Sequence, residues 1–137
     1  MDLADTSAWM ARQRSQEASA EFEELARTHH LATCDVVRFE LLRTTQDEQE
    51  FVSRREELDA LPNVSIGPRV WRRALDVFEL FARQGPLHHR RVRWPDLLVA
   101  AAAERAEVPV LHYDRHFELI AEVTGQPVRA IAPLGSL

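Results

Sequence analysis

The chain has 137 residues, of which 45% are hydrophobic and 28% charged, and its formal net charge at pH 7 is −5. This length predicts one domain over residues 1–137 with a sizeable core, and the acidic balance argues against a broad surface that coats nucleic acid. The longest apolar run, Leu97 to Ala103, is far too short to span a bilayer, so we expect no membrane association. The single Cys34 excludes an internal disulfide and, with no secretory signal pattern at the N-terminus, predicts a reducing, cytoplasmic compartment.

The first residues predict a short strand from Asp2 to Ala4, with Asp5 at its end. Thr6 or Ser7 is expected to cap a helix that starts near Ala8, because short hydroxyl side chains accept hydrogen bonds from the first free N–H groups. A second helix is predicted from residue 17 to residue 27, where apolar residues recur at helical spacing.

Leu31 to Cys34 predicts a second strand, and Asp35 is a plausible cap for the helix over residues 36–43. Glu40 lies about five residues into this helix, roughly 7–8 Å from its start at 1.5 Å per residue. A glutamate side chain could reach back to the sheet edge where the helix begins. Alternatively, Glu40 occupies a solvated polar stripe with Arg43, and the residues alone leave both readings open.

The middle of the chain predicts two amphipathic helices around a short strand from Val64 to Ile66. The first helix spans residues 46–61, and its expected apolar face consists of Phe51, Val52, Leu58 and Leu61. The second opens at Pro68, and its expected buried stripe consists of Val70, Trp71, Ala74, Val77, Phe78 and Phe81. We interpret these aromatic residues as core or dimer surface rather than as platforms for stacking bases.

The composition of residues 84–93 predicts a loop that carries dense positive charge on an acidic protein. Arg90, Arg91 and Arg93 could contact the phosphates of a polyanionic substrate, because a guanidinium group binds phosphate in a bidentate manner. Arg115 is a further candidate for such a contact. The alternative is a solvated basic loop that balances the acidic helices.

Residues 94–117 hold the most informative stretch of the chain. Pro95 suits the first position of a helix whose alanine-rich, nearly continuous apolar run predicts burial on most sides. Pro109 is expected to end that helix, and the run of branched residues after it predicts a short buried strand. Asp96 then lies in the first turn of the helix and Asp114 just past the strand. A helix to residue 124, with Gly125 after it, and a strand over residues 128–131 follow.

Four acids thus lie near strand ends or helix starts: Asp5, Glu40, Asp96 and Asp114. Taken singly, each is more simply a helix-start or turn residue. In a parallel sheet they would meet at the carboxyl-terminal edge, where open α/β folds bind ligands. Clustered carboxylates repel and need protons or cations to coexist, and all-oxygen ligands favour Mg²⁺ or Mn²⁺ over zinc. That combination suits metal-assisted hydrolysis of a phosphodiester.

The same segments resemble a known family. The opening Asp5-Thr6-Ser7-Ala8, the helix containing Phe39 to Arg43, the segment Asp96 to Ala101 and the segment Tyr113 to Phe117 resemble, in order, the four acidic motifs of PIN-domain proteins. The resemblance is to VapC-type toxins of VapBC toxin–antitoxin systems in particular, and it covers essentially the whole chain.

This resemblance implies a three-layer α/β/α fold with a mainly parallel central sheet and a homodimer. It implies an endoribonuclease that uses Mg²⁺ or Mn²⁺ to activate water against RNA and that a cognate VapB-type antitoxin neutralises. Asp5 and Asp96 would be the principal metal ligands, and Glu40 and Asp114 would complete the acidic catalytic pocket. Thr6 or Ser7 would orient Asp5 by hydrogen bonding.

Three other classes of protein were considered. A receiver-like signalling domain is excluded, because it needs an acidic pair and a lysine, whereas Thr6 follows Asp5 and all 17 basic side chains are arginine. No nucleophile motif of a protease is present. A catalytically inactive PIN-like module that binds a partner is the remaining alternative. The four intact acids argue against it, because nothing structural would keep four like charges together.

Overall fold

A five-stranded parallel sheet forms the centre of the computed structural model, which describes residues 1–137. The strand order across the sheet is β3-β2-β1-β4-β5. The strands are β1 (Asp2–Ala4), β2 (Leu31–Cys34), β3 (Asn63–Val64), β4 (Val110–His112) and β5 (Val128–Ala130). The expected parallel sheet is therefore confirmed, and the first two predicted strands agree with the structure residue for residue.

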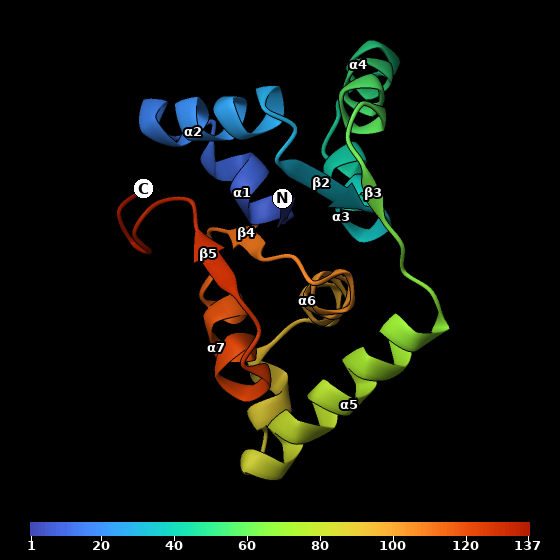
Figure 1. The fold of residues 1–137 in the computed structure, drawn as a ribbon, viewed down its shortest axis with the longest axis vertical. Helices are drawn as coiled ribbons and strands as arrows, with labels where there is room; N and C mark the ends of the chain where they lie inside the picture. The colour runs from blue at the N-terminus through green and yellow to red at the C-terminus, as the bar shows by residue number, and fades with distance from the viewer.

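Seven α-helices and one 3-10 helix connect these strands. They are α1 (Thr6–Ala11), α2 (Gln16–Arg27), α3 (Asp35–Arg43), α4 (Glu48–Asp59), α5 (Pro68–Gln84), η1 (His88–Arg91), α6 (Trp94–Ala106) and α7 (Arg115–Thr124). Figure 1 shows α1 and α2 on one side of the strands and α6 and α7 on the other, with α5 packed outside α6. This arrangement confirms the three-layer α/β/α fold. None of the helices combines the length and apolar character needed to cross a bilayer.

Helix α6 lies at the centre of the hydrophobic core, as its composition predicts. Every residue from Pro95 to Ala103 is buried, and the helix packs against α5, α7, α3 and strands β3 and β4. The core comprises 30 buried hydrophobic residues from all layers, so α6 is shielded on nearly every side. The helix ends at Ala106 because Glu107 takes a left-handed conformation with φ 58°, a little before the position that Pro109 alone suggested.

Two predicted helix caps were wrong, and both errors concern an acid. Helix α1 begins at Thr6 instead of Ala8, because Asp5 itself is the cap and its side chain accepts a hydrogen bond from the Ser7 backbone N–H. At the start of α3 the cap position is Cys34, which makes no side-chain capping bond, and Asp35 is the first helical residue. Asp5 therefore belongs both to a strand end and to a helix start.

The expected apolar faces of α4 and α5 were partly wrong. Leu58 of α4 is buried, but Phe51 and Val52 are exposed. In α5, Val70 is buried whereas the adjacent Trp71 is 52% exposed. Neighbouring residues differ by about 100° around a helix, so a periodic pattern alone does not fix which of two adjacent apolar residues faces the core. Residues 84–93 are also more ordered than a loop, because η1 forms within them.

Candidate active site

The four acids lie near the point where the order of the strands across the sheet reverses. The chain runs from β1 to its neighbour β2 on one side and later places β4 on the other side of β1. Ligands of open α/β folds bind outside the carboxyl ends of strands at such a switch point. Asp5 directly follows β1, Asp114 lies two residues after β4, and Asp96 lies in the first turn of α6, the helix that leads into β4.

Asp5 is held rigidly by one of its oxygen atoms, while the other oxygen has no partner. Its Oδ2 accepts hydrogen bonds from the Ser7 backbone N at 2.9 Å and from the Ser7 hydroxyl at 2.6 Å. The Ser7 hydroxyl in turn accepts a hydrogen bond from the Tyr113 backbone N at 2.9 Å. Ser7 therefore joins the ends of β1 and β4 beneath Asp5. The Oδ1 atom of Asp5 is buried without any hydrogen-bond partner.

The environment of Asp5 disfavours its charged form. Burial raises the pKa of Asp5 to about 7 from 3.8, and the negative charges of Asp96 and Glu40 add to this effect, while the bonds from Ser7 oppose it. In the absence of a cation, this carboxyl group is only partly ionised near neutral pH. A cation would favour the ionised form.

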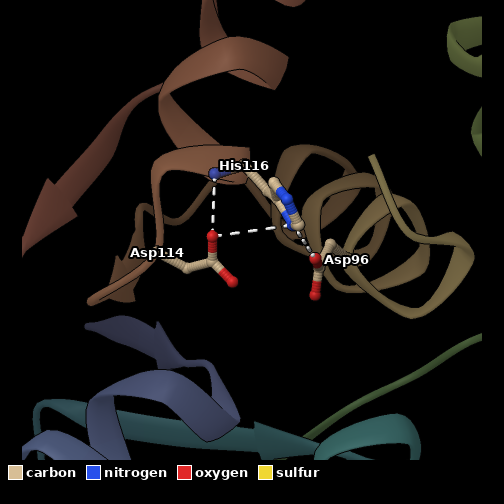
Figure 2. A group of neighbouring side chains, drawn as sticks. All are labelled: Asp96, Asp114 and His116. Carbon is tan, nitrogen blue, oxygen red and sulfur yellow. Dashed lines mark hydrogen bonds and ion pairs between the residues drawn. The ribbon is translucent and has the colours of Figure 1, made fainter. Parts of the chain in front are cut away.

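Asp96, Asp114 and His116 form a compact group beside Asp5. Figure 2 shows their side chains pointing toward one another. The His116 Nδ1 atom lies 2.9 Å from Asp96 Oδ2 and 3.6 Å from Asp114 Oδ1, and one ligand atom from each residue lies within 4.8 Å of the others. Asp96 is 3% exposed. Its burial raises its pKa, and the hydrogen bond with His116 opposes this shift.

The position of His116 is fixed by the start of α7. Asp114 caps this helix, and its Oδ1 accepts a hydrogen bond from the His116 backbone N at 2.9 Å. His116 was not among the residues selected from the sequence. Its place two residues after Asp114 was the only available signal, because its partner Asp96 is 20 residues away along the chain.

Glu40 reaches the site from the second turn of α3. Its Oε1 accepts a hydrogen bond from the Thr6 hydroxyl at 2.8 Å, and its Oε2 forms an ion pair with Arg93 Nη2 at 3.2 Å. The expected reach toward the sheet edge is therefore observed, and pairing with Arg43 is not. Thr6 holds Glu40 and not Asp5, so of the two hydroxyl residues expected to orient Asp5, Ser7 alone contacts it.

The four arginines considered for nucleic-acid binding are placed differently from one another. Arg93 precedes α6 and contacts the acidic pocket through Glu40, with 58% of its side chain exposed. Arg90 and Arg91 lie on η1, and Arg115 opens α7; all three are exposed. The structure thus brings one guanidinium group into the pocket and leaves three on the surface.

The donor set fits a divalent cation. Asp5, Glu40, Asp96 and Asp114 supply oxygen atoms, which Mg²⁺ and Mn²⁺ prefer. Burying an unpaired carboxylate oxygen is unfavourable, and a cation beside Asp5 would both satisfy its Oδ1 atom and offset the repulsion among the acids. The arrangement can therefore bind a metal ion and present it to an anionic substrate at the sheet edge.

Comparison with known proteins gives consistent results. The family model described as PIN domain matches residues 3–123. Ribonuclease VapC18 of Mycobacterium tuberculosis is 36% identical over 133 residues, which cover 97% of this chain and 96% of that protein. Ribonuclease VapC21 of the same species is 38% identical over 109 residues, 77% of this chain and 76% of that protein.

Solved structures show the same fold at low sequence identity. The DNA-bound VapBC of Salmonella typhimurium matches with a TM-score of 0.71 at 13% identity, covering 95% of this chain and 97% of that chain. VapBC2 of Rickettsia felis, bound to a DNA fragment from its promoter, also gives a TM-score of 0.71, at 12% identity, covering 93% of this chain and 96% of that chain.

Proposed function

This chain belongs to the PIN-domain family, and we propose that it is a VapC-type endoribonuclease toxin that hydrolyses RNA phosphodiester bonds with a divalent metal ion. The observation that carries the proposal is the buried Asp5, whose Oδ1 atom lacks a partner inside a cluster of four acids. The similarity to proteins named Ribonuclease VapC supports the choice of RNA as substrate.

The four acids divide into two pairs by exposure. Asp5 and Asp96 are each 3% exposed, and we assign them as the principal ligands of Mg²⁺ or Mn²⁺. The side chains of Glu40 and Asp114 are 26% and 27% exposed, so they complete the pocket on the side that an RNA strand would reach. When bound, the ion would polarise the phosphodiester and lower the pKa of an attacking water.

The chain's own residues position this chemistry. Ser7 fixes Asp5 through two hydrogen bonds, and Thr6 fixes Glu40. Arg93, which contacts Glu40, lies where its guanidinium group can also meet a phosphate of the substrate. In the reaction, a water oxygen bonds to phosphorus and the water gives up a proton, the bond from phosphorus to the leaving ribose oxygen breaks, and that oxygen takes up a proton.

We further propose two protein partners. The first is a cognate VapB-type antitoxin, because the structural neighbours described above are VapBC complexes. The second is another copy of this chain. Trp71 and Leu75, one turn apart on α5, are 52% and 66% exposed, and large apolar side chains that share a helix face favour burial against a partner.

The decisive experiment is cleavage of total cellular RNA by protein purified free of antitoxin, with Mg²⁺, with Mn²⁺ and with EDTA. Wild type, Asp5→Asn and the matched control Asp2→Asn would be compared. Discrete fragments from wild type and Asp2→Asn, absent with Asp5→Asn or EDTA, are the expected result. Intact RNA with all three proteins would favour the alternative, a catalytically inactive partner-binding module. Equal cleavage by all three would reject the assigned site.

A further inference from the structure

His116 introduces a nitrogen atom into a site that is otherwise built from oxygen. Its Nδ1 atom lies 2.9 Å from Asp96 Oδ2 and 3.6 Å from Asp114 Oδ1. The cap of α7 holds this ring in place, because the His116 backbone N is bonded to the same Asp114 side chain. Only 25% of the side chain is exposed, so the ring is part of the pocket wall and not a mobile surface group.

The spacing of these atoms is compatible with a single shared ion. Ligands about 2.1 Å from a six-coordinate ion lie roughly 3.0 Å apart when adjacent and roughly 4.2 Å apart when opposite. The separations of 2.9 Å and 3.6 Å fall at or close to this range, and the set as a whole stays within 4.8 Å. A small relaxation of side chains would therefore place all three residues around one cation.

A second observation points to a cation near this group. Asp5 is 3% exposed, and its Oδ1 atom is buried with no hydrogen-bond donor. Asp5 and Asp96 are close enough for their charges to interact. The pocket therefore contains an unsatisfied acceptor beside the Asp96, Asp114 and His116 group, and no protein side chain supplies the missing positive partner.

We propose that Nδ1 of His116 is a direct ligand of the ion that Asp96 shares with Asp5 and Asp114, and that the site consequently prefers Mn²⁺ to Mg²⁺. Mg²⁺ takes oxygen ligands almost exclusively, whereas Mn²⁺ begins the first-row series whose affinity for mixed nitrogen and oxygen sites rises toward Cu²⁺, so a nitrogen ligand favours Mn²⁺ when these two ions alone are compared. This inference rests on the proposed function for the role of His116 in RNA cleavage. It deepens that function by specifying which of the two ions the site prefers.

Coordination requires a specific protonation state of the ring. The contact with Asp96 is satisfied when Nδ1 carries the proton and donates it. A ring nitrogen binds a metal through its lone pair, so the proton on Nδ1 would move to Nε2 when an ion binds. The competing arrangement keeps the proton on Nδ1, and His116 then only orients Asp96 by hydrogen bonding. The two arrangements differ in whether nitrogen touches the metal.

The test is electron spin echo envelope modulation of Mn²⁺ bound to the full-length protein, made metal-free beforehand. Wild type is expected to show modulation from a directly bound ¹⁴N nucleus, and labelling with ¹⁵N-histidine should replace it with the ¹⁵N pattern. The variant His116→Asn keeps a donor for Asp96 and offers an oxygen ligand, but it removes the ring nitrogen. It should lose the modulation. Because loss of a mere supporting contact already costs about tenfold or more in metal affinity, the Mn²⁺ Kd should rise by at least that factor, and the Mg²⁺ Kd should rise less.

The matched control is His30→Asn, because His30 is exposed and lies just before β2, at the opposite edge of the sheet. It should behave as wild type. Bound Mn²⁺ without nitrogen modulation in wild type, or equal loss of Mg²⁺ and Mn²⁺ affinity in His116→Asn, would overturn the inference and leave the carboxylate-based nuclease proposal intact. Nitrogen coordination without RNA cleavage would support the ligand assignment and reject the nuclease.

Discussion

The acids at the two ends of strand β1 have opposite electrostatic surroundings. At its start, Asp2 Oδ2 accepts a hydrogen bond from Arg129 Nη2 at 2.7 Å, and Arg129 also pairs with Glu21 of α2. At its end, three residues later, Asp5 has no basic partner and shares its surroundings with Asp96 and Glu40. One acid is neutralised within the fold, and the other has no basic partner in it.

This difference separates a structural contact from a functional one. The side chains of Arg129 and Asp2 are 41% and 13% exposed, and a partly exposed ion pair of this kind contributes about 1 kcal/mol to stability. Around Asp5, burial and like charge both work against the ionised state. Buried acids whose surroundings disfavour their charged form, such as Asp5 and Asp96, are typical of a functional site.

The largest expected effect is on cleavage. Asp5→Asn and Asp96→Asn should each lower the rate of RNA cleavage by about a thousandfold or more, because a misplaced metal forfeits several kcal/mol of transition-state stabilisation. Asp2→Asn should stay within about twofold of wild type. Gel-based cleavage rates of the three variants under one metal concentration measure the contrast, and a comparable loss in Asp2→Asn would remove the distinction between the two ends.

The second expected effect is on stability without metal. The unfolded chain loses the Asp5 proton near pH 3.8, while the folded protein retains it to about pH 7, so the free energy of unfolding should fall as the pH rises between these values. Asp5→Asn lacks this ionisation and should be more stable than wild type at pH 8, by at most roughly 4 kcal/mol at about 1.4 kcal/mol per unit of pKa.

Urea denaturation in EDTA at pH 5 and at pH 8 measures the gain in the free energy of unfolding of Asp5→Asn. This gain should be smaller at pH 5 and when metal is added. Asp2→Asn should show the opposite sign, a loss of about 1 kcal/mol, because it breaks the partly exposed ion pair with Arg129. A variant Asp5→Asn that is less stable than wild type at pH 8 would contradict the unfavourable burial of this charge.

A third, smaller effect is expected at Ser7. Ser7→Ala removes both the hydroxyl bond to Asp5 and the acceptor for the Tyr113 backbone N, and loss of such a supporting contact typically lowers metal affinity or activity 10- to 100-fold. The control is Ser15→Ala, because Ser15 caps α2 through the Ala18 N–H. That variant should lose about 1 kcal/mol of stability with unchanged metal affinity, as measured by titration calorimetry.

The backbone arrangement was largely predictable from the sequence, for a physical reason. Buried parallel strands are short, mostly apolar runs. Leu31 to Cys34 is such a run, and each of its residues is buried. The buried α6 was equally clear from its alanines. The order of these elements also indicated that Asp5, Asp96 and Asp114 would share one sheet edge, and the structure brings them there.

Side-chain partners were less predictable, because they depend on distances between elements that the sequence does not contain. Thr6 and Ser7 are adjacent and chemically alike, yet one bonds Glu40 and the other Asp5. His116 meets Asp96 across the contact between α6 and α7, which lie 20 residues apart at these positions. The outward direction of Trp71 depends in the same way on the rotation of α5 against its neighbours.

The smallest expected effect concerns the basic residues beside the acidic pocket. Arg90 and Arg91 lie exposed on η1, close in sequence to the pocket residue Arg93. Each phosphate contact to single-stranded RNA contributes a slope of about −0.7 in a plot of log affinity against log salt concentration, because binding releases counterions. The double variant Arg90→Gln/Arg91→Gln should therefore flatten this slope by about 1.4 if both residues contact phosphate.

Binding is best measured by fluorescence anisotropy in the Asp96→Asn background, which should prevent cleavage during the titration. The control Arg27→Gln/Arg55→Gln removes the same charge from α2 and α4, where the side chains are 71% and 60% exposed. A similar change of slope in both double variants would show that RNA senses only the net charge. A change confined to Arg90 and Arg91 would extend the contrast between the two sheet edges to the substrate, because RNA phosphates would then be held beside the edge where Asp5 has no basic partner.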